Sequence, residues 1–90
     1  MPTQEIRVTG YVQGVGFRSY VFQTAVTNGV RGETWNGRDG AVHVIAQHDD
    51  EAVLKRFEEE MWTGPGRVDG VRVEGAIEGN YAGFEISAAR

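Results

Sequence analysis

The segment from Gly10 to Arg18 has the residue types and the spacing of an anion-binding loop. Its glycines allow the backbone to turn so that successive N–H groups point toward one centre, and a helix expected to begin near Phe17 would add the partial positive charge of its N-terminus. The guanidinium of Arg18 can bind an anion through two parallel hydrogen bonds. The segment is therefore predicted to hold a phosphate group.

The parts of this pattern also have ordinary structural explanations. A glycine-spaced turn is more often only a turn, and Arg18 alone is more often a solvated charge. Asn36-Gly37, a second polar turn, suits the positive φ angles of a hairpin connection. A site becomes the better explanation if the start of the first helix and the end of the second strand meet at one edge of a sheet, as we expect.

The elements that would position these residues follow the order βαββαβ, with a short final strand. Period-two alternation predicts the strands, and apolar residues every three to four positions predict the helices. The expected strands cover residues 6–12, 30–35, 41–47, 84–86 and the stretch from 68 toward 77, and the expected helices cover 17–28 and 49–62. The fold class is therefore expected to be α+β: a ferredoxin-like βαββαβ sandwich with an antiparallel sheet and two helices on one face.

The composition limits the chemistry and the compartment. Ninety residues with 40% hydrophobic content fit one domain over residues 1–90, which would bury about two-thirds of its unfolded surface. Because the sequence has no cysteine, disulfides, thiolate nucleophiles and cysteine metal sites are excluded. The N-terminus lacks the pattern of a signal peptide, and no run approaches the ~20 apolar residues that span a bilayer. We expect a cytoplasmic protein with no membrane partner.

The charge distribution favours a small ligand over a nucleic acid. The formal net charge is −4 and the basic residues are scattered along the sequence, whereas nucleic-acid binding usually requires a basic surface. An RNA-recognition module shares the βαββαβ order but needs aromatic residues on its central strands, and residues 41–46 contain none. We therefore expect no nucleic-acid partner. Nothing in the composition demands a dimer, so a monomer is expected.

Other catalytic arrangements find little support in the sequence. There is no HExxH motif and no clustered set of His, Asp and Glu ligands, so neither a metal nor a cofactor is expected. The two serines, Ser19 and Ser87, do not lie in nucleophile elbows. His43 is expected on the strand face opposite to that of its neighbours, and His48 just before the second helix. Neither histidine is expected to be catalytic.

Two blocks of the sequence resemble a known family. They are Gly10-x-Val12-Gln13-Gly14-Val15-x-Phe17-Arg18 and Gly32-x-x-x-Asn36-x-x-Asp39-Gly40. Both are similar to motifs of the acylphosphatases, and further matches extend the resemblance over nearly the whole chain. The resemblance implies a cytosolic, metal-free acylphosphatase (acylphosphate phosphohydrolase) with the ferredoxin-like fold. Such an enzyme hydrolyses acyl phosphates to a carboxylate and inorganic phosphate.

The resemblance also implies roles for particular residues. Arg18 would bind the phosphoryl group, and Asn36 would hold the attacking water. The backbone amides that would bind the substrate phosphate belong to Gln13, Gly14, Val15, Gly16 and Phe17. These roles suit the reaction because the leaving carboxylate is weakly basic and needs no general acid, so that catalysis can rest on positioning and charge neutralisation. The proton of the water is expected to pass to a phosphate oxygen of the substrate.

Some positions depart from the family pattern. Gly37 stands where a short polar residue is frequent, and His48-Asp49 stand where a glycine-proline pair is frequent. The ending Ser87–Arg90 differs from the family's usual ending. We therefore have no reason to expect a contact between the last residues and the site. Neither Arg18 nor Asn36 is touched by these departures.

A second function fits the first block. Residues 12–18 also resemble the N-terminal domain of hydrogenase-maturation carbamoyltransferases. That resemblance implies a non-hydrolytic acyl-phosphate or carbamoyl-phosphate binding domain of a larger protein. Because the sequence begins at Met1 and ends soon after the last expected strand, an independent enzyme is the expected case.

Overall fold

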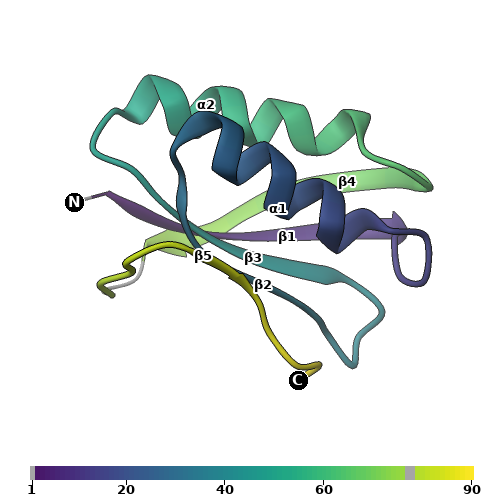
Figure 1. Ribbon diagram of the computed structural model, residues 1–90. Coiled ribbons are helices and arrows are strands. Elements are labelled where there is room, and N and C mark those ends of the chain that lie inside the picture. Colours follow the sequence, from purple (N-terminus) through teal and green to yellow (C-terminus); the bar gives the residue numbers. More distant parts are fainter. Residues whose placement is uncertain (1, 77–78) are drawn as a thin grey trace.

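Two helices cover one face of a five-stranded sheet in the computed structural model, which describes residues 2–76 and 79–90 (Figure 1). The elements in chain order are β1 (Thr3–Tyr11), α1 (Phe17–Asn28), β2 (Arg31–Asn36), β3 (Val42–Gln47), α2 (Glu51–Glu60), the 3-10 turn η1 (Met61–Thr63), β4 (Arg67–Ala76) and β5 (Phe84–Ile86). The predicted α+β ferredoxin-like sandwich is confirmed. The expected continuation of the fourth strand to Ile77 lies outside the described residues.

The strand order in the sheet is β4-β1-β3-β2-β5. The pairs β1–β3, β1–β4 and β2–β3 are antiparallel, as expected, but β5 pairs in parallel with β2, so the sheet is mixed. The parallel pairing follows from the chain path: β4 runs opposite to β1, and the strand that follows it must return in the direction of β1 and β2. β1 and β2 both pair antiparallel with β3, so these two strands end at the same edge of the sheet.

The core lies between the sheet and the helices. Its buried apolar side chains come from alternate positions of the central strands and from one side of each helix: Ile6, Val8, Val42, Val44, Ala46, Phe17, Val21, Ala25, Leu54, Phe57 and Met61. The intervening strand positions face the opposite, uncovered side of the sheet. His43 is on that side, as predicted, and its ring stacks on Trp35 with centroids 5.5 Å apart.

The helix boundaries follow from local signals in the sequence. Gly29 adopts the left-handed conformation (φ 67°) that ends α1, and its N–H donates to the Val26 carbonyl at 3.2 Å. Asp50 caps α2, because its Oδ1 accepts from the Ala52 N–H at 2.9 Å. None of the helices in the described part of the chain has the length and the apolar character needed to cross a membrane.

Replacing Gly32 should damage the β2–β3 pairing on which the position of Asn36 depends. Gly32 has φ 144°, and a Cβ atom there would collide with the backbone carbonyl of Ile45. We expect Gly32→Ala to lower the free energy of unfolding by roughly 3 kcal/mol or more, measured by urea denaturation, because backbone strain and a clash combine. Gly40→Ala is the matched control: it also has positive φ (87°) but meets no atom within 4 Å. A loss in Gly32→Ala no larger than that of the control would contradict the prediction.

Candidate functional site

The turn after β1 and the end of β2 lie side by side at one edge of the sheet, at the right in Figure 1. Gln13 joins them directly: its side-chain Nε2 donates to the Gly37 carbonyl at 2.8 Å and to the Ala41 carbonyl at 3.0 Å. The loop of residues 12–16 is thereby tied to both ends of the 37–41 connection. Only the backbone amide of Gln13 was expected to take part in the site, and no sequence signal indicated that its side chain would link the two segments.

The 12–16 loop is shaped by two glycines in the left-handed region. Gly14 has φ 76° and Gly16 has φ 84°, and a Cβ at either position would meet no atom within 4 Å, so the space outside the loop is open. Gly16 is also the N-cap residue of α1, where no side chain caps the helix and no acidic residue occupies the first turn. The N-terminal amides of α1 therefore remain available to an anion, and the helix dipole favours negative charge there.

Arg18 lies in the first turn of α1 and is partly buried. It lines a cavity of about 120 Å³ together with Gly14, Gly16 and Ile86. Within the part of the chain that the structure describes, its guanidinium forms no ion pair or hydrogen bond, so the charge is not neutralised by the protein. The structure thus brings Arg18 and the predicted loop glycines together around one open cavity. The contribution of Ile86 from β5 was not expected from the sequence.

Asn36 ends β2 opposite Val42, on the side of the sheet that faces the helices. Its side-chain Oδ1 is buried and has no hydrogen-bond partner among the described residues. An unpaired buried acceptor costs about 1–3 kcal/mol, and proteins retain such groups mainly where they serve a function. Asn36 is not among the residues that line the Arg18 cavity in the described structure. It is connected to the loop through the hydrogen bond from Gln13 to the carbonyl of the adjacent Gly37.

The C-terminal residue fixes the backbone beside Asn36, contrary to the sequence analysis, which gave no reason to expect such a contact. The Arg90 N–H donates to the Asn36 carbonyl at 3.0 Å, and the Arg90 carbonyl accepts from the Arg38 N–H at 2.9 Å. The Arg90 guanidinium lies 4.1 Å from the centre of the Trp35 ring. The contact arises because β5 runs parallel to β2, so the residues after it reach the same edge of the sheet.

Glu33 anchors this C-terminal segment from the uncovered face of the sheet. Its carboxylate accepts hydrogen bonds from the hydroxyls of Ser87 and Tyr81 and from the Arg90 guanidinium. Burial raises the pKa of Glu33, but these three hydrogen bonds together outweigh burial and hold the pKa below its ordinary value. Glu33 therefore stays ionised at neutral pH and keeps the Arg90 side chain over Trp35.

Asp39 organises the turn between β2 and β3. One of its carboxylate oxygens accepts from the Ala41 N–H at 3.0 Å, and the other pairs with Arg7 at 3.1 Å. The hydrogen bonds from Ala41, His43 and Arg7 lower the pKa of Asp39 to about 2. A Cβ at Gly37 would collide with the ends of the Asp39 and His43 side chains. The glycine at position 37, a departure from the family pattern, leaves room for these two groups.

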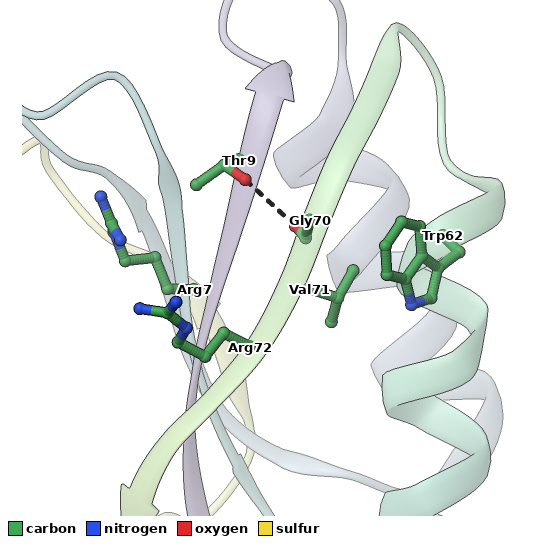
Figure 2. Close-up of a pocket in the computed structure, with 6 residues that line it drawn as sticks. All are labelled: Arg7, Thr9, Trp62, Gly70, Val71 and Arg72. Carbon is green, nitrogen blue, oxygen red and sulfur yellow. Dashed lines mark hydrogen bonds between the residues drawn. The ribbon is translucent and has the colours of Figure 1, made fainter.

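A larger cavity, of about 320 Å³, is lined by residues of β1, β4 and η1 and does not include the predicted site residues. Figure 2 shows that Arg7 and Arg72 lie on one side of the β1–β4 pair, whereas Trp62 lies on the other. The lining residues therefore do not converge on one point. The smaller cavity beside Arg18, with its uncapped helix N-terminus, is the better candidate for a phosphate.

Comparisons with known proteins identify the family of this chain. The family model described as Acylphosphatase matches residues 4–86. A protein named Acylphosphatase from Thermotoga maritima is 41% identical over 88 residues, which is 96% of this chain and 97% of the relative. The crystal structure of acylphosphatase from Bacillus subtilis superimposes with a TM-score of 0.89 at 31% identity, covering 97% of this chain and 99% of that one. The chain belongs to the acylphosphatase family, the enzymes that hydrolyse acyl phosphates, and the expectation from the sequence is confirmed.

A longer protein also contains a similar unit. The crystal structure of full-length HypF, in a phosphate- and nucleotide-bound form, matches with a TM-score of 0.80 at 28% identity. The match covers 98% of this chain but only 12% of HypF. The Thermotoga and Bacillus proteins, in contrast, match along nearly their whole length and with higher identity. The alternative of a non-hydrolytic binding domain is therefore not favoured.

Removing the Gln13 amide should separate the two halves of the site. Gln13→Met keeps the size of the side chain but leaves two carbonyl oxygens without their donor, so we expect a loss of about 1–3 kcal/mol in the free energy of unfolding. Turnover should fall by more than phosphate affinity does, because the segment after Asn36 loses its tie to the loop. Urea denaturation, steady-state kinetics and inhibition by phosphate measure the three effects. Gln23→Met, on the exposed side of α1, is the control, and equal behaviour of the two variants would refute the role of Gln13.

Proposed function

We propose that this chain hydrolyses acyl phosphates by direct attack of water, with the phosphoryl group bound by Arg18 and by the backbone amides of residues 13–17. The observation that carries the proposal is the single cavity that Arg18 shares with Gly14 and Gly16 at an N-terminus without a side-chain cap. Three sources of positive potential meet there: a guanidinium, loop amides and a helix dipole. A phosphate group offers oxygens to all three.

The reaction requires few catalytic groups from the protein. The leaving group is a carboxylate, which departs without protonation, so the main requirement is to neutralise the charge on the phosphoryl oxygens and to hold the reactants in line. A guanidinium and fixed amides meet the first requirement. No metal or other cofactor is needed for this chemistry, and the proposed hydrolysis is metal-independent.

Asn36 is proposed to position the attacking water. Its amide can accept a hydrogen bond through Oδ1 and donate one through Nδ2, and rotation about its last side-chain bond can present either group. The unpaired Oδ1 supports this role, because the protein supplies no competing donor within the described residues. The bonds from Gln13 and Arg90 to the adjoining backbone limit the movement of this residue. The water then transfers its proton to a phosphate oxygen of the substrate.

The remaining parts of the proposal concern the protein as a whole. The chain is proposed to act as a single domain over residues 1–90, as a monomer in the cytoplasm, on a small acyl phosphate. The inorganic phosphate product should compete for the same cavity. No nucleic-acid or membrane partner is part of the proposal. The cavity would bind the phosphoryl group, which all acyl phosphates share, so we expect the enzyme to accept substrates with different acyl groups.

Replacing Arg18 should remove both binding and catalysis. We expect Arg18→Gln to lower the turnover of benzoyl phosphate, followed by ultraviolet absorbance in the presence of a chelator, by about 100- to 1000-fold or more, because a preorganised donor to the transition state is lost. Inhibition by inorganic phosphate should weaken in parallel. Arg56→Gln, at an exposed position of α2, should behave as the unchanged protein. Equal phosphate affinity in Arg18→Gln and the unchanged chain would contradict the assignment.

Replacing Asn36 should separate catalysis from binding. Asn36→Ala is expected to lower turnover by about 100-fold, since the water is no longer oriented, while inhibition by phosphate changes less than about threefold. Asn80→Ala, at an exposed position, is the control. Unchanged turnover in Asn36→Ala would eliminate its role. If the unchanged protein bound phosphate but did not hydrolyse benzoyl phosphate faster than buffer, hydrolysis itself would be the wrong function.

A further inference from the structure

The uncovered face of the sheet carries a second group of chemically active side chains. Glu5 on β1, His43 on β3 and Glu74 on β4 each place one possible ligand atom within 4.8 Å of the others. These are an imidazole nitrogen and two carboxylate oxygens. The three residues are far apart in the sequence, so only the pairing of β1 with both β3 and β4 brings them together.

The pairing of β1 with β4 contains an irregularity at this place. Val73 lies opposite Ile6, and Gly75 lies opposite Glu5, so Glu74 is the extra residue of a β-bulge. Bulges commonly redirect a side chain toward a site. Gly75 adds no side chain above the sheet, and a Cβ there would meet no atom within 4 Å. The space beside the two glutamates is therefore open to an ion and its water ligands.

The imidazole of His43 is held in a defined orientation. Its Nε2 lies 3.1–3.2 Å from the two carboxylate oxygens of Asp39, and its ring stacks on Trp35 with an interplanar angle of 6°. A carboxylate accepts hydrogen bonds, so this contact favours the tautomer of His43 that carries its proton on Nε2 and has the lone pair on Nδ1. A histidine that donates one N–H to a carboxylate while the other nitrogen binds a metal is a common arrangement in metalloproteins.

The two glutamates lack counterions among the described residues. Arg7, which lies opposite His43 on β1, pairs with Asp39 instead. Arg72 lies opposite Arg7 on β4, and Figure 2 shows both side chains on the same side of the strands, yet Arg72 forms no ion pair with either glutamate. Two carboxylates within 4.8 Å of each other repel. A divalent cation between them would remove that repulsion.

We propose that Glu5, His43 and Glu74 bind a divalent first-row transition metal ion such as Zn²⁺, with water completing the coordination. One imidazole and two carboxylates suit Zn²⁺ and its neighbours in the series better than Mg²⁺ or Ca²⁺, which prefer oxygen ligands alone. The ion would link β1, β3 and β4 and stabilise the sheet. The site is on the face opposite to the helices and takes no part in the proposed hydrolysis.

A titration with Zn²⁺ in a phosphate-free buffer tests the proposal. The sequence has two histidines, so nuclear magnetic resonance can follow both imidazoles separately. We expect saturable 1:1 binding that shifts the His43 signals and leaves those of His48 unchanged. At Zn²⁺ concentrations about a hundredfold above Kd, Tm should rise by on the order of 10 °C, because the ion binds only the folded chain.

Variants separate this site from adventitious binding. Glu74→Gln, at an exposed position where folding is not at risk, should weaken Zn²⁺ binding at least tenfold, and His43→Gln should abolish it. His48→Gln is the control and should bind as the unchanged chain does. Equal Zn²⁺ affinity in Glu74→Gln and the unchanged chain, a response confined to His48, or no saturable binding up to about 1 mM Zn²⁺ would each overturn the proposal. None of these readouts depends on hydrolysis.

Discussion

The shared pairing of β1 and β2 with β3 is the constraint on which the site depends. Because β1 and β2 flank β3 and are both antiparallel to it, they run in the same direction and end at one edge of the sheet. The loop that follows β1 and the asparagine that ends β2 therefore meet without any long connection. The Gln13 side chain then fixes the distance between them with two hydrogen bonds. Strand direction and one bridging amide thus bring together the two parts of the proposed site.

The local arrangement explains how a chain with net charge −4 can bind an anion. A long-range attraction is not required where a guanidinium, an uncapped helix N-terminus and open loop amides act within a few ångströms of the ligand. The positive potential is kept because Arg18 has no acidic partner among the described residues. Other arginines, such as Arg7 and Arg90, are paired with Asp39 and Glu33. Arg18, beside the cavity, therefore keeps its charge available for a ligand.

The sequence predicted the parts of the fold that depend on local signals. Alternation on β1 and β3, the cap at Asp50 and the left-handed Gly29 all have local causes, and the element order followed from them. The family was indicated separately, by the resemblance of the Gly10–Arg18 and Gly32–Gly40 blocks to acylphosphatase motifs. It did not predict the parallel pairing of β5, and with it the contact of Arg90 with Asn36. Nor did it predict the Glu74 bulge, because a register shift depends on which strands pair and leaves no periodic trace in either sequence.

The connection between β2 and β3 serves both faces of the sheet. Its Gly37 and Ala41 carbonyls accept from Gln13 beside the proposed catalytic site, while the Asp39 side chain holds His43 and Arg7 on the uncovered face. The same turn is therefore fixed from both faces of the sheet. The structural effect of a substitution on one face can be transmitted to the other through only a few hydrogen bonds. This double attachment also accounts for Gly37, since the space of its absent side chain is filled by Asp39 and His43. A polar side chain there would have to displace the groups that keep the turn in place.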